Sequence, residues 1–297
     1  MGTNRWTSAG IGDLSGHTIV VTGASSGIGA VTSRELARAG ARVVMAVRDL
    51  DKGGAVADTI AGQVELRQLD LTSLASVRNF ADVCDGDIDI LINNAGVMHA
   101  PEGQTADGFE LHIGTNHLGH FALTNLLLPR VKYRVVNVTS LLSSRGRIDL
   151  EDLNWDRRDY SSSQAYADSK LANVLFTYEL QRRFTRAGST ARAMSAHPGV
   201  AKTNLLSHVT GLAGSFTKLA VSVIAQDVDS GALPTLFAAT QDIPGNAFVG
   251  PGGFAHTRGF PELAKPPHAS QNPERAARLW DLSCGLTNTE FTRPRNF

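Results

Sequence analysis

The strongest constraint on the fold of this chain is a glycine-rich turn between a short β-branched run and a helical pattern. Residues 18–21 read Thr-Ile-Val-Val, which is typical of a buried strand, and glycines follow at positions 23, 27 and 29. A helical pattern comes next, and residues 41–47 read as a second strand. Strand, turn, helix and strand together take about 30 residues, the size of a βαβ unit. This unit predicts the beginning of a parallel sheet.

The alternation of strands and helices continues along the chain. Further strands are expected near residues 64–69, 88–93, 134–139, 190–196 and 247–250. Helices are expected near residues 50–61, 73–84, 104–129, 163–187, 229–241 and 273–285. Short apolar strands between helices favour a mostly parallel sheet with helices on both faces. Because no linker, repeat or low-complexity tract divides the chain, we expect one α/β domain of the Rossmann-type, doubly wound class.

Two segments interrupt this alternation. One is a charged stretch over residues 141–162, and the other spans about 199–228. Both leave the carboxyl ends of strands, where open α/β sheets bind their ligands, so we expect them to form walls around a substrate. The polar, glycine-bearing residues 1–16 predict a loose N-terminal arm, and residues 17–297 predict the catalytic domain.

The composition excludes several classes of function. Lys plus Arg and Asp plus Glu both number 28, and the pI is about 7.1, so nothing predicts binding to nucleic acid or to an anionic membrane. No apolar run approaches the ~18–20 residues of a membrane span. The two cysteines are too far apart in sequence to form a ligand pair. Together with the lack of a signal-peptide core, these features predict a cytoplasmic protein.

Three histidines, His112, His117 and His120, could share one helix face. No acidic residue or cysteine joins them on that face in the sequence. We therefore expect buried, solvent-facing or interface histidines and no metal site.

The glycine turn predicts a phosphate-binding loop, because backbone N–H groups and the positive end of a helix dipole lie behind it. The end of the second strand then selects the cofactor. Val47 stands where an NAD site usually has an acid, and Arg48 follows with a guanidinium suited to the 2′-phosphate of NADP. Asp49 could instead pair with Arg48 or favour NAD. We predict NADP, with NAD as the alternative.

Tyr166 and Lys170 are four residues apart in a predicted helix and so share one face. Lowering the pKa of a tyrosine from about 10 to about 7 takes about 4 kcal/mol. One positive charge about 4 Å away supplies roughly that much at an effective dielectric constant of about 20. The pair therefore predicts a proton donor and acceptor.

The motifs of this chain occur together, in the same order, in a known family. The chain resembles the short-chain dehydrogenases/reductases from about residue 17 to 285, and within them the retinol dehydrogenase-like group, which includes WW-domain oxidoreductase and protochlorophyllide reductase relatives. The motifs that carry this resemblance are Thr22–Gly29 (TGASSGIG), Asn93–Gly96 (NNAG), Asn116, Ser140, Tyr166–Phe176 (YADSKLANVLF), His197–Val200 (HPGV) and Gly250–Gly253 (GPGG).

The resemblance implies roles for four catalytic residues. Tyr166 would protonate a carbonyl oxygen in reduction or act as base in oxidation. Lys170 would hold the ribose hydroxyls of the nicotinamide half and keep the tyrosine pKa low. Ser140 would orient the substrate oxygen, and Asn116 would position water in a proton relay behind the lysine.

The resemblance also implies an NADP site with no metal. Asp70 and Leu71 would lie at the adenine, Asn94 to Gly96 at the ribose, and Pro198 to Val200 with Thr203 at the carboxamide. The expected cofactor-binding residues are Gly23, Ser25, Ser26, Gly27, Ile28, Gly29, Arg48, Asp70, Leu71, Asn94, Ala95, Gly96, Tyr166, Lys170, Pro198, Gly199, Val200 and Thr203.

The predicted function is hydride transfer between the cofactor and a carbonyl or alcohol group of a small, fairly apolar substrate. The alternatives are an NADP-binding sensor with little catalysis and a reductase of a carbon–carbon double bond. The long helices near 104–129 and 163–187 would suit a homodimer or homotetramer. The substrate and the direction of the reaction stay open, and retinoid specificity is not carried over because this chain shows no membrane anchor.

Overall fold

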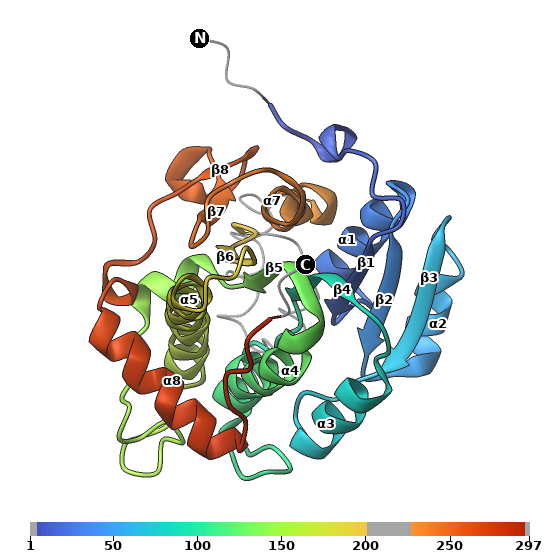
Figure 1. Ribbon diagram of the computed structural model, residues 1–297. Helices are drawn as coiled ribbons and strands as arrows, with labels where there is room; N and C mark the ends of the chain where they lie inside the picture. The colour runs from blue at the N-terminus through green and yellow to red at the C-terminus, as the bar shows by residue number, and fades with distance from the viewer. Residues whose placement is uncertain (1–4, 201–226, 295–297) are drawn as a thin grey trace, which may run out of the picture.

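One mixed sheet forms the centre of the molecule. The computed structural model describes residues 5–200 and 227–294, and within them eight strands pair in the order β3-β2-β1-β4-β5-β6-β7-β8 (Figure 1). All neighbouring strands are parallel except β7 and β8. The strands are β1 (Thr18–Thr22), β2 (Arg42–Val47), β3 (Gln63–Gln68), β4 (Ile88–Asn93), β5 (Val131–Val138), β6 (Arg192–Ala196), β7 (Phe248–Pro251) and β8 (Pro261–Leu263).

The helices cover both faces of this sheet (Figure 1). They are α1 (Gly27–Arg38), α2 (Leu50–Ala57), α3 (Leu74–Val83), α4 (Gly119–Leu127), α5 (Ser162–Arg186), α7 (Val228–Thr240) and α8 (Pro273–Thr287). Leu36 of α1 and Leu236 of α7 pack against one face, whereas Phe80 of α3 and Phe176 of α5 pack against the other. Helix α8 lies outside α4 and α5, where Trp280 meets Phe121. The expected single-domain, doubly wound α/β fold is confirmed.

The chain order of the strands creates a crevice. From β1 the chain moves outward to β2 and β3, and it then returns to β4 on the other side of β1. At such a switch point the loops after the two central strands diverge toward opposite faces of the sheet, which leaves room for a ligand at the carboxyl ends. The loops after β1 and β4 carry the glycine turn and the Asn94–Gly96 turn.

The helix expected over residues 104–129 begins later than predicted. Residues 104–110 form a turn in which Thr105 donates its N–H to the carbonyl of Phe109 and accepts the N–H of Phe109 on its side chain. Gly108 has a φ of +81°, which a helix cannot accommodate. The chain becomes helical at 111–112, passes through a π-helical segment, η2 (Ile113–Leu118), and continues as α4. Turn chemistry therefore overrides the apolar periodicity here.

The expectation of a loose N-terminal arm is wrong for residues 5–16. The Trp6 ring meets Phe237 of α7 edge-on, at 5.3 Å between centroids. Ile11 and Leu14 pack against the same core, and Leu14 donates its N–H to the carbonyl of Ala39. The sparse apolar residues of this segment are enough to dock it on the sheet's outer helices.

Strand β8 was not predicted from the sequence, because its three residues are too few to show the alternation of apolar and polar side chains that marks a strand. Most of the predicted substrate loop 199–228 lies outside the described residues. None of the helices in the described part of the chain combines the length and apolar character needed to cross a bilayer.

Candidate active site

A cavity of about 860 Å³ opens at the carboxyl ends of β1 and β4. Its lining includes most of the residues that the sequence assigned to the cofactor: Gly23, Ser25, Ser26, Gly27, Ile28, Gly29, Arg48, Asp70, Leu71, Asn94, Ala95, Gly96, Tyr166, Lys170 and Pro198. Gly199 and Val200 lie just beyond Pro198 and are not part of the lining, and Thr203 lies outside the described residues. The cavity also has lining residues that the sequence did not assign, among them Lys52, Thr72, Met98, Ala100 and Thr115.

The glycine turn after β1 packs its backbone closely and has no room for a side chain at Gly29. A Cβ on Gly29 would stand 2.3 Å from the carbonyl oxygen of Gly23 and 2.5 Å from Nδ2 of Asn94. Gly23 itself has a φ of +67°. The N-cap of α1, Ser26, makes no side-chain capping bond to the first turn. The N-terminal N–H groups of α1 therefore have no such side-chain acceptor, and the turn fits a phosphate group.

Thr22 ties the glycine turn to the Asn94–Gly96 turn. Its hydroxyl accepts the N–H groups of Asn94 and Ala95 at 2.9 and 3.0 Å, and its carbonyl accepts Nδ2 of Asn94 at 2.8 Å. His120 completes the arrangement, because Nδ1 donates to the carbonyl of Asn116 and leaves Nε2 to accept the Thr22 hydroxyl at 2.9 Å. Burial lowers the pKa of His120 to about 4, so the ring is neutral.

At the end of β2, Arg48 is an exposed cation that lines the cavity. Asp49 does not neutralise it, because Asp49 caps α2 by accepting the N–H of Lys52 at 3.0 Å and pairs with the Lys52 ammonium at 3.4 Å. Among residues 5–200 and 227–294, Arg48 has no hydrogen-bond or ion-pair partner. One alternative from the sequence, an Arg48–Asp49 pair, is therefore wrong, and a free guanidinium is left at the rim.

Helix α5 brings Tyr166 and Lys170 to the inner end of the cavity. Their relative exposures are 6% and 4%. The Tyr166 hydroxyl is hydrogen-bonded to the side chain of Ser140, at the end of β5. The Lys170 ammonium donates to the carbonyl of Val138 at 3.3 Å and lies 5.8 Å from the centre of the Tyr166 ring.

Burial dominates the proton affinities of this pair. Burial raises the pKa of Tyr166, whereas the hydrogen bond with Ser140 acts to lower it. Burial lowers the pKa of Lys170 to about 8. The expectation that Lys170 holds the Tyr166 pKa near neutrality is therefore wrong for this structure. Desolvation opposes both charged forms, and this outweighs any attraction between them.

Asn116 lies in the π-helical segment η2, and such segments are frequent at functional sites. Its side chain accepts the N–H of Val97 at 2.8 Å and donates to the Val97 carbonyl and to Oγ of Ser169, at 3.0 and 2.9 Å. A Cβ on Gly96 would stand 3.1 Å from both Oδ1 of Asn116 and Nζ of Lys170. The strand β4 loop, η2 and α5 therefore converge at this point.

The turn after β6 is held in place by contacts with Thr257 and His197. Gly199 has a φ of +67°, and a Cβ there would stand 2.3 Å from the Thr257 carbonyl. Val200 donates its N–H to that same carbonyl at 2.9 Å. His197, which is buried, accepts the Gly199 N–H on Nδ1 at 3.3 Å.

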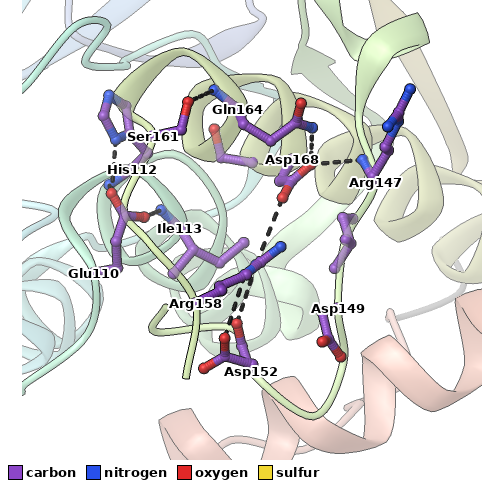
Figure 2. A network of polar contacts seen from close by, with 12 residues as sticks. Glu110, His112, Ile113, Arg147, Asp149, Asp152, Arg158, Ser161, Gln164 and Asp168 are labelled. Atoms are coloured by element: carbon purple, nitrogen blue, oxygen red, sulfur yellow. Dashed lines mark hydrogen bonds and ion pairs between the residues drawn. The ribbon is translucent and has the colours of Figure 1, made fainter. Parts of the chain in front are cut away.

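The charged segment 141–162 is anchored on α5 (Figure 2). The Arg158 guanidinium stacks 3.7 Å from the Trp155 ring and reaches the carboxylates of Asp152 and Asp168 at 3.3 and 3.8 Å. Asp168 also accepts the N–H of Arg147 at 2.6 Å. Within the described residues, no group of three or more His, Cys, Asp or Glu side chains could hold a metal ion.

Comparisons with known proteins agree with this geometry. The family model for short chain dehydrogenases matches residues 17–211. Retinol dehydrogenase 13 of Homo sapiens is 42% identical over 298 residues, which cover 93% of this chain and 86% of that protein. The crystal structure of an uncharacterized protein from Mycobacterium paratuberculosis is 53% identical, with a TM-score of 0.86, and the match covers 97% of this chain and 99% of that one.

A third similar protein, from Beutenbergia cavernae, was solved with NADP bound at low occupancy. It is 25% identical with a TM-score of 0.59, and the match covers 77% of this chain and 91% of that one. The matched family model and the extensive likeness to retinol dehydrogenase 13 place this chain among the oxidoreductases of its fold. The chain belongs to the short chain dehydrogenase family.

Proposed function

We propose that this protein is an NADP-preferring oxidoreductase that interconverts a carbonyl and an alcohol group on a small, fairly apolar substrate. The observation that supports this most directly is the buried Tyr166 side chain, whose hydroxyl is hydrogen-bonded to the half-buried Ser140 and whose helix also carries the buried Lys170. Tyr166 and Lys170 line the same cavity as the glycine turn and Arg48. The cofactor's redox end and a proton donor can therefore meet in one site.

The residues of the cavity suit NADP. The α1 N-terminus and the glycine turn would hold the pyrophosphate, and the free Arg48 guanidinium would pair with the 2′-phosphate. The bound cofactor supplies the hydride. NADP in the Beutenbergia cavernae neighbour supports the choice of cofactor.

The chain's own residues would manage the proton. The Ser140 hydroxyl would hydrogen-bond the substrate oxygen and fix it beside Tyr166, whose hydroxyl donates a proton to that oxygen. Because burial raises the pKa of Tyr166, the phenol form prevails at neutral pH, and this form is the acid that reduction requires. Oxidation requires the phenolate, so its rate should rise with pH more steeply than that of reduction.

The substrate class follows from the walls near Tyr166. Met98, Ala100 and Pro101 offer an apolar surface along one side of the cavity. Such a wall favours carbonyl compounds with a hydrocarbon body over sugars or charged acids. Since the similar human protein is named a retinol dehydrogenase, retinal belongs in the panel of substrates to be tested.

The decisive experiment compares two tyrosine variants on α5 with NADPH and a panel of aldehydes and ketones. Tyr166→Phe should lower turnover by about 10²–10⁴-fold while NADPH binding is kept, because general acid catalysis contributes about that much. Tyr178→Phe, on the same helix and outside the cavity lining, should retain wild-type turnover. Equal turnover by both variants would contradict the tyrosine mechanism. NADPH that binds but is oxidised by no carbonyl would instead point to a binding protein.

A further inference from the structure

The apolar wall of the cavity includes a backbone segment that is clamped on both sides. Ala100, which lines the cavity, donates its N–H to Nε2 of His112 at 3.3 Å. Its carbonyl accepts the hydroxyl of Ser162, in the first turn of α5, at 2.9 Å. The wall is thereby tied to the helix that carries Tyr166.

The hydrogen bonds of His112 define its tautomer. Nε2 accepts from Ala100, so it carries no proton, and the ring proton lies on Nδ1. Nδ1 then donates to Oε1 of Glu110 at 2.7 Å (Figure 2). The relative exposures of His112 and Glu110 are 0% and 3%, so bulk solvent does not compete for these bonds. The carboxylate of Glu110 therefore determines which nitrogen of His112 faces the wall.

Glu110 is itself saturated with donors. Besides Nδ1 of His112, it accepts the backbone N–H groups of His112 and Ile113 at 2.9 and 2.8 Å and the Tyr160 hydroxyl at 3.1 Å. Burial raises the pKa of Glu110, but these bonds from His112 and Ile113 bring it below its usual value. The carboxylate stays charged and keeps the ring proton on Nδ1. Tyr160 connects this arrangement to the end of the charged segment 141–162.

His112 also contacts the residue that we assign to proton transfer. Its ring meets the Tyr166 ring edge-on, with the centroids 6.2 Å apart and the planes at 74°. One side chain therefore touches both the wall and the tyrosine. A shift of His112 would change the distance between the Tyr166 hydroxyl and a substrate resting on that wall.

We propose that His112, fixed by Glu110 in its Nδ1–H tautomer, is a positioning residue that sets the substrate wall at Ala100 relative to the Tyr166 hydroxyl. This inference rests on the proposed function. It concerns how the carbonyl substrate is presented and leaves the phosphate-binding end of the cavity untouched. The expected signature is a loss in the use of carbonyl substrates without a loss in NADPH affinity.

Two substitutions of His112 distinguish its role as hydrogen-bond acceptor from its role as an aromatic ring against Tyr166. His112→Phe keeps an aromatic ring against Tyr166 but removes the acceptor for the Ala100 N–H. His112→Gln loses the ring, but its side-chain oxygen can reach about the place of Nε2 and accept that N–H. We expect kcat/KM for carbonyl substrates to fall about 10–100-fold in the Phe variant, since displacements near 1 Å have such effects. The Gln variant should recover most of that loss.

Affinity for NADPH, measured by fluorescence titration, should change by less than about twofold in both variants. A role in stability alone would lower affinity and melting temperature together, and Gln would not rescue kcat/KM. Wild-type kcat/KM in the Phe variant, or equal losses in both variants, would overturn the inference.

A readout without turnover keeps the inference testable if the proposed function fails or the Phe variant does not fold. In wild-type protein labelled with ¹⁵N-histidine, the His112 resonances should report a protonated Nδ1 and an unprotonated Nε2. The Ala100 amide should exchange its hydrogen slowly. An Nε2–H tautomer with a rapidly exchanging Ala100 amide would overturn the inference, whatever the substrate panel shows. A wild-type enzyme inactive on every carbonyl, with the expected tautomer and exchange, would refute the proposed function alone.

Discussion

The ammonium of Lys170 lies 5.8 Å from the centre of the Tyr166 ring, and both side chains are almost completely buried. Burial moves the two pKa values in opposite directions, upward for Tyr166 and from 10.5 down to about 8 for Lys170. Each group is thus biased toward its neutral form. A charged lysine at neutral pH therefore lowers the free energy of unfolding, and the proposed mechanism requires that charge.

Lys170→Met should therefore stabilise the protein at pH 7. The wild-type folded state releases the Lys170 proton at about pH 8, whereas the unfolded chain keeps it to 10.5. Between these values the unfolded state binds more protons, so wild-type stability rises with pH through that window. The free energy of unfolding of the variant should exceed that of the wild type by about 1–3 kcal/mol at pH 7. This gap between variant and wild type should narrow toward pH 10. The Val138 carbonyl keeps a partner in the Asn173 amide, at 3.4 Å.

Urea unfolding at pH 7 and pH 10 measures this gap. Lys265→Met, at an exposed position, serves as the control and should show no change of the gap with pH. A gap for Lys170→Met that is equal at both pH values would contradict the burial argument. Lys170→Met should also lose carbonyl reduction, because the ammonium is gone from the site.

Gly29→Ala tests whether the glycine turn is shaped for close approach. The new Cβ would meet the Gly23 carbonyl oxygen and the Asn94 amide, which is itself held on Thr22. We expect a loss of about 1–3 kcal/mol in the free energy of unfolding, as for other overpacked sites, and weaker NADPH binding. Gly54→Ala in α2, where a Cβ would meet no described atom within 4 Å, should instead stabilise by about 0.4–1 kcal/mol. If Gly29→Ala changed neither the free energy of unfolding nor NADPH binding, the turn would have room to open around a side chain.

Arg48→Ala tests the cofactor preference. A charge-assisted hydrogen bond contributes about 1.5–3 kcal/mol, so NADPH affinity should fall about 10–100-fold. NADH lacks the 2′-phosphate, and its affinity should change by less than about threefold. Titrations with both cofactors give the comparison, and Arg42→Ala, at the amino end of β2, is the matched control. Equal losses for the two cofactors would mean that Arg48 does not read the 2′-phosphate.

The sequence predicted the sheet well because β1, β2 and β4 are apolar runs buried on both faces, which is a local signal. It also placed the glycine turn and Tyr166 on the elements that bring them to one cavity. The turn at 104–110 escaped prediction, because the Thr105 side chain and Gly108 decide against helix within a run of helical periodicity.

The proton affinities could not be predicted from spacing. Four residues of separation in a helix place Lys170 near Tyr166, but only the fold shows that burial outweighs their attraction. In the same way, the sequence predicted buried, solvent-facing or interface positions for His112 and His120 and no metal site, but it could not predict their hydrogen-bond partners. Their actual partners, Glu110 and Ala100 for one and Thr22 for the other, come together through tertiary contacts.

Arg158→Ala should release the charged segment 141–162 from α5. The guanidinium lies between the buried carboxylates of Asp152 and Asp168, and its loss leaves both without their cation. Because Arg158 itself is partly exposed, we expect a loss of about 2–4 kcal/mol rather than the largest values known for broken buried pairs. Burial raises the pKa of Asp168, and the Arg158 charge is among the groups that lower it.

The variant should therefore raise the Asp168 pKa further. A folded-state pKa above the unfolded value favours the fold at low pH, and that contribution is lost as pH rises through the folded value. The destabilisation by Arg158→Ala should thus be larger at pH 8 than at pH 5 in urea unfolding, and proteolysis within 141–162 should be faster. Arg157→Ala, at the exposed neighbouring position, should change neither quantity. A loss that is the same at both pH values would show that Asp168 keeps its charge without Arg158.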